Sequence, residues 1–204
     1  MKLVSIDYRL TAVDKSILSN ASGAILQSID IGEKGTRLPN ELSYISHVGL
    51  YEPVVLKFSS EQGSFYMEFY IIGGENDICA EQMGYAIKMG SIPGSMIYTH
   101  PGLVDKFMPR SSSKSVLVDK LVSKVKIFGN EKTEMNVRKN VKIDIYSLIL
   151  ILFEHPDGSK TAIHPGEIRS IVYSNLNQST DIILSEIVQP GSGERNIVLM
   201  DEIS

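Results

Sequence analysis

The chain has 204 residues, 43% of them hydrophobic and 22% charged, which is enough for one large domain or two small ones with an apolar core. A formal net charge of −4 gives no electrostatic reason to expect nucleic acid or an anionic membrane as a partner. The single cysteine excludes an intramolecular disulfide and every multi-cysteine zinc site, and a lone thiol fits a reducing compartment.

No secretion or membrane signal is visible in the sequence. The N-terminal stretch MKLVSIDYRL carries charges where the apolar region of a signal peptide would lie. The longest apolar run, Tyr146–Phe153, is too short to span a bilayer. We therefore expect a cytoplasmic protein without a membrane span.

The first half of the chain predicts a mixture of helices and strands. Residues Thr11–Ser28 can form a helix, and three later segments rich in β-forming residues predict strands at Tyr44–Tyr51, Val54–Ser59 and Ser64–Ile72. A second helix is predicted over Asp77–Met89, because apolar residues recur there at helical spacing and Gly90 is placed to end it.

A proline followed by a serine run, from Pro109, interrupts this pattern and predicts a linker at 110–115. A short helix at Val116–Lys124 is then expected to lead into five strands, at Lys124–Phe128, Val141–Phe153, Thr161–His164, Ile168–Tyr173 and Thr180–Val188. Asp157-Gly158 predicts a hairpin turn between two of them.

These elements predict an α+β fold in two domains. Residues 1–109 would form a mixed α/β domain, and residues 116–188 a small antiparallel β-barrel or sandwich. Residues 189–204, rich in glycine, serine and charge, would be a flexible tail.

One group of residues suggests catalysis by a cysteine nucleophile. Cys79 would lie in the first turn of the helix predicted over Asp77–Met89, where unpaired N–H groups and the helix dipole lower the pKa of a thiol. A thiolate nucleophile needs a nearby base and a group that orients the base. His47, on a predicted strand, is the candidate base, and Glu61 is the candidate orienting residue.

Two motifs carry a resemblance to a known family. The stretch SHVGLY at 46–51 resembles the histidine strand of the permuted relatives of NlpC/P60 cysteine peptidases, which have a papain fold. The stretch DICAEQM at 77–83 is similar to the family's cysteine motif, and THPGL at 99–103 to a segment that follows it. The resemblance covers about residues 28–104 and implies a papain-like N-terminal domain with Cys79 as nucleophile, His47 as base and Glu61 as the acidic residue.

Simpler interpretations of the same residues stay open. His47 can be a partly buried residue of a sheet, and Cys79 can be a small apolar residue of a helix. The other three histidines each precede a proline, as turn residues do, and they lack the spacing of metal ligands. We expect no metal and no cofactor.

Two functions therefore remain as hypotheses. The first is a cysteine hydrolase, a peptidase, amidase or acyl-lipid hydrolase, acting on a peptide or lipid substrate. The alternative is a non-enzymatic structural or assembly protein of a multi-subunit particle, such as a phage virion or tail, that associates with itself or with other proteins. Its apolar strands Tyr146–Phe153 and Ile182–Val188 would then pair or pack across subunits, and the protein would be virion-associated.

Overall fold

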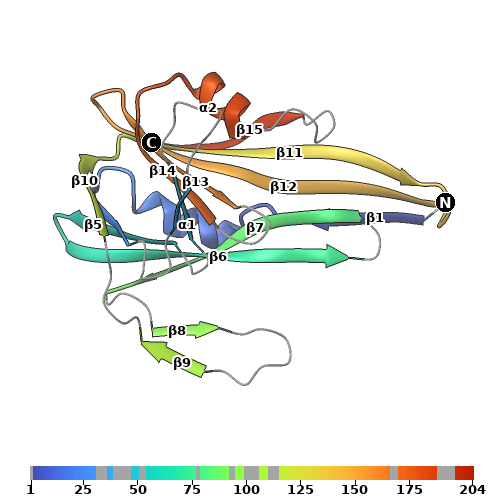
Figure 1. Ribbon diagram of the computed structural model, residues 1–204, viewed down its shortest axis with the longest axis horizontal. Helices are drawn as coiled ribbons and strands as arrows, with labels where there is room; N and C mark the ends of the chain where they lie inside the picture. Colours follow the sequence, from blue (N-terminus) through green and yellow to red (C-terminus); the bar gives the residue numbers. More distant parts are fainter. Residues whose placement is uncertain are drawn as a thin grey trace.

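The computed structural model describes residues 2–30, 36–38, 47–50, 54–76, 79–91, 95–98, 106–109, 115–165, 170–187 and 196–204. These residues form a mostly β protein with two large sheets and two short helices (Figure 1). The larger sheet has the strand order β15-β11-β12-β13-β14-β4-β3, and β1 pairs with β12 beside this path. Its strands are β1 (Lys2–Asp7), β3 (Thr36–Leu38), β4 (His47–Leu50), β11 (Lys124–Asn136), β12 (Val141–Glu154), β13 (Lys160–Pro165), β14 (Ser170–Leu176) and β15 (Ile197–Ile203).

The smaller sheet has five strands in the order β10-β2-β5-β6-β7, and all its neighbouring pairs are antiparallel. They are β2 (Ile25–Asp30), β5 (Val54–Ser60), β6 (Gly63–Asn76), β7 (Cys79–Gly90) and β10 (Ser115–Leu121). A separate hairpin joins β8 (Ser95–Tyr98) to β9 (Lys106–Pro109). The two helices are α1 (Ala12–Ser19) and α2 (Thr180–Ile187).

The two large sheets share one apolar core. On the larger sheet, Ile151 and Phe153 of β12 belong to this core together with Phe58 of β5, whose ring centroid is 6.1 Å from that of Phe153. The intervening residues of β12 face the other way, where Leu150 and Leu152 pack in a second cluster with Ile183 of α2. The second half of β12 is therefore buried on both faces, between the smaller sheet and α2, which is why its sequence is continuously apolar.

Helix α1 covers part of the outer edge of β7. Thr11 and Asp14 form a capping box at the start of the helix, with the Asp14 carboxylate accepting from the Thr11 N–H at 2.9 Å. The other carboxylate oxygen of Asp14 accepts the backbone N–H of Ile87 at 2.8 Å. Because Asp14 is buried, this side chain both begins the helix and satisfies a donor on an edge strand.

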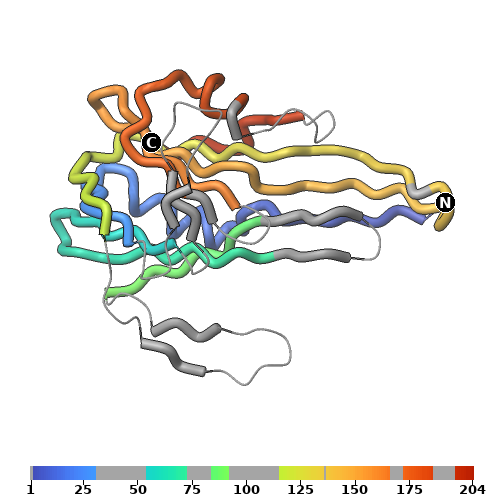
Figure 2. The backbone as a smooth tube through the Cα atoms, in the orientation of Figure 1, coloured from blue at the N-terminus to red at the C-terminus, as the bar shows by residue number. Residues whose placement is uncertain are grey.

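The first half of β12 continues away from the shared core. There residues 141–146 of β12 lie between β1, which is parallel to them, and residues 131–136 of β11, which are antiparallel. We call these three segments the projection; they extend farthest to the right in Figure 1, and Figure 2 shows the N-terminal strand running along their length. Burial alternates along 141–146, and Val141, Ile143 and Ile145 pack with Val4 and Ile6 on one face.

The predicted α+β fold with a papain-like N-terminal domain is wrong. Strands from both sides of residues 110–115 share both large sheets: β1 pairs with β12, and β10 pairs with β2. The sandwich expected for the second half of the chain is instead built from strands of both halves. Part of the predicted flexible tail is also ordered, because β15 pairs with β11 along the edge of the larger sheet.

Three predicted elements have the opposite secondary structure. The helix expected over Asp77–Met89 is β7, and the helix expected over Val116–Lys124 is mostly β10. The strand expected over Thr180–Val188 is α2. The helix expected over Thr11–Ser28 ends at Ser19, and β2 begins at Ile25.

Candidate functional site

The backbone places the proposed catalytic cysteine and histidine in different sheets. His47 is the first residue of β4 in the larger sheet, where it pairs with Tyr173 and Leu38. Cys79 is the first residue of β7 in the smaller sheet, where it pairs with Asn76. The positions of the His47 and Cys79 side chains lie outside the described part of the structure. The helix start that would have lowered the pKa of the thiol is absent from residues 79–90, because they form a strand.

Glu61 lies at the opposite end of a long strand from Cys79. It is exposed in the turn between β5 and β6, two residues before β6 begins, whereas Cys79 pairs with the last residue of β6. Strand β6 has 14 residues and a strand rises about 3.3 Å per residue, so its two ends are roughly 40 Å apart. Glu61 is therefore too far from Cys79 to share an active site with it, and the hydrolase remains a hypothesis from sequence motifs alone.

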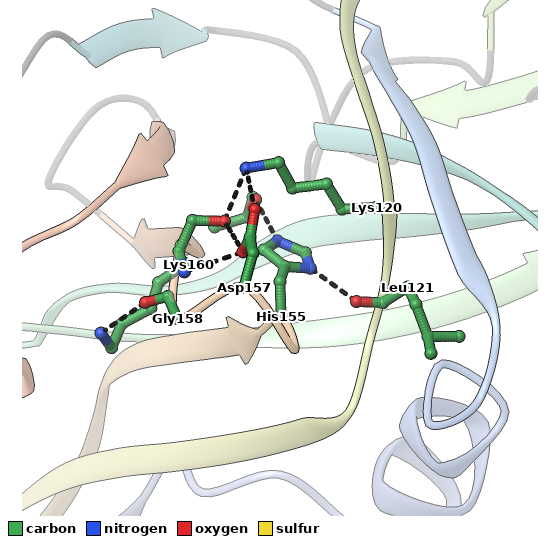
Figure 3. A network of polar contacts seen from close by, with 8 residues as sticks. Lys120, Leu121, His155, Asp157, Gly158 and Lys160 are labelled. Atoms are coloured by element: carbon green, nitrogen blue, oxygen red, sulfur yellow. Dashed lines mark hydrogen bonds and ion pairs between the residues drawn. The ribbon is translucent and has the colours of Figure 1, made fainter.

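A polar network lies at the hairpin between β12 and β13 (Figure 3). The ring of His155 is buried, with Nδ1 2.9 Å from the Leu121 carbonyl oxygen and Nε2 3.1 Å from the Thr161 hydroxyl. A carbonyl oxygen only accepts, so Nδ1 carries the hydrogen and Nε2 accepts from Thr161. Burial lowers the pKa of His155, which favours this neutral form. His155 thus ties the end of β10 to the hairpin.

Lys120 and Asp157 form an ion pair beside this histidine. The Lys120 ammonium is 2.9 Å from the Asp157 carboxylate and donates to the Ser159 hydroxyl at 2.7 Å, and that hydroxyl donates to Asp157 at 2.6 Å. The hydrogen bonds from Ser159 and Lys120 hold the pKa of Asp157 far below its usual range. Both groups beside the Ser159 hydroxyl have other partners, because Lys120 pairs with Asp157 and His155 bonds to Leu121 and Thr161. The network therefore joins β10 to the β12–β13 turn.

His164, the other histidine at this hairpin, has a bond of its own: its Nδ1 is 2.6 Å from the Ile149 carbonyl oxygen. His100, the remaining His-Pro residue, lies outside the described residues. Within the described ranges, no group of three or more histidine, cysteine, aspartate or glutamate residues could hold a metal ion. In the same ranges, no helix is long and apolar enough to cross a membrane.

Alternate residues of β1, at one edge of the projection, direct their backbone groups away from β12. The N–H of Lys2 donates to the Asn140 carbonyl at 3.1 Å and that of Tyr8 to the Tyr146 carbonyl at 2.8 Å, so even-numbered residues of β1 point their backbone groups at β12. Backbone groups alternate in direction along a strand, so the N–H and C=O groups of Leu3 and Ser5 point away from β12. Among the strands that the structure describes, none pairs with this outer edge.

The opposite edge of the projection is formed by residues 131–136 of β11. The Glu131 N–H points away from β12 and lies 3.4 Å from the Asn196 carbonyl, where the pairing with β15 ends. Thr133 and Met135 therefore also direct their N–H and C=O groups outward. In the described part of the chain no strand pairs with them on this side. Among the described residues, each flank of the projection thus has an edge without a paired strand, which we call an open edge.

One face of the projection carries exposed apolar side chains. Leu3 and Met135 flank Lys142 in one row across the three strands, and each is 62% exposed. Val137, just beyond the end of β11, is 81% exposed. Farther along the same face, the Arg9 guanidinium lies 4.2 Å from the centroid of the Tyr146 ring and pairs with Asp7. Natural sheets usually protect such edges, so this part of the surface suggests an interaction site.

The fold and this surface define a two-sheet, mostly antiparallel β protein with an open-edged projection. No protein-family model, no curated protein and no solved structure matches the sequence. The sequence signals for the open edges were faint: the alternation of apolar and polar residues over 141–146 indicates a strand buried on one face only. Which of its edges stay unpaired depends on strand order, which the sequence does not reveal.

Proposed function

We propose that this chain is a non-enzymatic structural subunit that assembles with further copies of itself through the projection. The observation that supports this proposal best is the pair of open strand edges on the two flanks of one three-stranded segment. An unpaired edge is a template for a strand of another chain. Neither edge contains a proline, which would remove a backbone donor and discourage such pairing.

A comparison within the same molecule supports this interpretation. On β7, an edge strand of the smaller sheet, the outward N–H of Ile87 donates a hydrogen bond to the buried carboxylate of Asp14. The fold thus provides a partner for an edge donor where α1 passes β7. The corresponding donors of Ser5 and Thr133 have no backbone partner among the described residues. Exposed Leu3 and Met135 beside them offer apolar area that a neighbouring copy would bury.

Sedimentation over a range of protein concentrations tests the proposal. A contact through one strand pair is small, so we expect oligomers that form as the concentration rises rather than one tight dimer. The variant Thr133→Lys places a charged side chain on an open edge and should shift the population towards monomers. The matched control is Gln62→Lys, which adds the same charge in the exposed β5–β6 turn and should sediment like the parent protein. A parent protein that stays monomeric at every concentration would contradict the proposal.

A further inference from the structure

We infer that the two open edges of the projection bind each other head to tail, so that β1 of one copy pairs antiparallel with residues 131–136 of β11 in the next copy. This inference rests on the proposed assembly function and specifies its contact. Repetition of the contact would join the projections of successive copies into one continuous sheet. Such a heterologous contact produces a ring if the rotation between copies closes, and an open filament if it does not.

The strand directions inside one copy set the relative orientation of two copies. β1 is parallel to β12 and β11 is antiparallel to β12, so β1 and β11 of one copy run in opposite directions. A neighbour that keeps the same strand direction therefore presents an antiparallel β11 edge to β1. Copies related by rotation about an axis along the strands meet this condition at every contact. A ring or tube with the strands running along its axis is the expected geometry.

The outward backbone groups set the register. Two antiparallel strands bond fully where outward-pointing residues face each other, which requires Leu3 and Ser5 of one copy to oppose Met135 and Thr133 of the next. In this register Ser5 opposes Thr133, and Leu3 opposes Met135. Inside one copy, Leu3 and Met135 are already aligned through Lys142 in a single row across the sheet. The contact would therefore extend that row into the next copy with no shift along the strand direction.

The side chains agree with this register on the exposed face. It brings together Leu3 and Met135, which are each 62% exposed in the free chain, and would bury part of both. At the other end, Asp7 opposes Glu131, and Arg9 offsets these two negative charges. Within one copy Arg9 pairs with Asp7, and the electrostatic influence of Glu131 also raises the pKa of Arg9. This guanidinium lies over Tyr146, between the Asp7 and Glu131 of its own copy, so across the contact it reduces the repulsion only through its ion pair with Asp7.

Two-fold pairings of like edges fit less well. If β11 paired with itself around Thr133, Met135 would oppose Glu131, whose N–H already faces the Asn196 carbonyl. If β1 paired with itself around Ser5, the exposed Leu3 side chain would oppose Asp7 on both sides of the axis. Only the head-to-tail contact matches two fully available residues on each edge and joins apolar to apolar.

Disulfide trapping distinguishes these arrangements. In a background with Cys79→Ser, the double variant Ser5→Cys/Thr133→Cys places one cysteine on each edge. Directly opposed residues of this bonded type have Cα atoms about 5.5 Å apart, which suits a disulfide. Inside one copy both positions pair with Asp144 from opposite sides, so they are separated by two strand spacings, about 9.6 Å, too far for an internal bridge. Any disulfide formed must join different copies.

With a mild oxidant, we expect the double variant to form dimers, trimers and higher multimers, or a covalently closed ring, that a reductant reverses. Each single variant serves as a control: Thr133→Cys alone forms a covalent dimer only if β11 pairs with itself, and Ser5→Cys alone only if β1 does. Ser5→Cys/Lys132→Cys, whose side chains lie on opposite faces, should cross-link poorly. If either single variant cross-links as much as the double variant, the head-to-tail contact is wrong.

The proposed function and its contact can fail separately. If the parent protein self-associates in sedimentation but the double variant gives no multimers, the assembly function stands and the head-to-tail contact is wrong. If the parent protein is monomeric at all concentrations and the double variant gives no multimers, both are wrong.

Discussion

Replacing Asp14 by alanine should destabilise the fold more than any other change at the start of α1. The buried carboxylate of Asp14 has two structural roles. One oxygen accepts from the Thr11 N–H at 2.9 Å and the Thr11 hydroxyl at 2.6 Å, and the other accepts the Ile87 N–H at 2.8 Å. The alanine variant removes the capping box and leaves a buried donor on β7 without a partner.

The size of the effect follows from these two losses. A buried donor left unsatisfied costs about 1–3 kcal/mol, and loss of the reciprocal bond of the capping box, from the Thr11 N–H to the carboxylate, costs about 1 kcal/mol. The free energy of unfolding should therefore fall by about 2–4 kcal/mol. Asp14→Asn keeps one oxygen that can accept the Ile87 N–H, but its amide group cannot accept from the Thr11 N–H. We expect it to lose roughly half as much.

Urea denaturation, followed by circular dichroism, measures these differences. Val13→Ala, on the neighbouring position of the same helix, is the control, because Val13 is 68% exposed and its truncation should change stability by less than about 0.5 kcal/mol. Thr11→Ala is the comparison for the cap, since it removes the bond from the Asp14 N–H to the Thr11 hydroxyl and leaves the bond between Asp14 and Ile87 in place. If Asp14→Ala costs no more than Thr11→Ala, the bond between Asp14 and β7 does not contribute as described.

Three further predictions concern the core and its pH dependence. Gly84→Ala should lower the free energy of unfolding by about 1–3 kcal/mol in urea denaturation, because the added Cβ would collide with the backbone oxygen of Tyr8. An unchanged midpoint would show that this approach is not tight. Ile183→Ala truncates a fully buried side chain of α2 and should lower the free energy of unfolding by about 2–5 kcal/mol. Ile182→Ala, at a side chain that is 47% exposed, should lower it far less, and equal losses in the two variants would contradict the packing of α2. Because burial lowers the pKa of His155 from 6.5, the unfolded chain binds the proton first, so stability should fall as pH drops below about 6.5 towards the folded pKa. His155→Gln should lack that part of the pH dependence, and an identical pH profile in this variant would refute the assignment.

Local sequence patterns predicted the strands that lie in the middle of the sheets. The segments Val54–Ser59 and Val141–Phe153 are rich in β-branched and aromatic residues, and each matches an observed strand within one residue at either end. The turn at Asp157-Gly158 is also confirmed, with Gly158 at a φ of 83° that favours glycine. In these places local preference and tertiary environment agree.

The pattern over Asp77–Met89 fitted two periods at once. Helical spacing was visible, but Tyr85 and Ile87 also alternate with less buried residues, as in a strand. The tertiary structure decided between them, because β7 pairs along the whole length of β6, and Gly84, a poor helix residue, lies against the backbone of Tyr8. At α2 the missed signal was a local one: Ser179, just before the helix, accepts the Ile183 N–H with its backbone oxygen at 3.1 Å, as a capping residue does.

The candidate site could not be predicted because it depends on strand order. The motif that suggested catalysis joined His47 to Cys79 by their order along the chain, but the backbone assigns them to different sheets. The open edges arise because β13 pairs only with Ile151–Glu154, so that β1 becomes the outer strand beside residues 141–146, and because the pairing of β15 with β11 ends at Asn130. No local pattern encodes where such pairings stop.

The pairing of β1 with β12 also has a consequence for how the protein folds. It joins residues 2–7 to residues 141–146, so more than half of the chain separates the two partners. Contacts at such long separation carry a large loop-closure cost and form slowly, whereas the β11–β12 hairpin is local. During synthesis, β1 leaves the ribosome long before its partner exists. We therefore expect docking of β1 to be a late folding step, so that the edge it presents to a neighbour becomes available only after the rest of the subunit has formed.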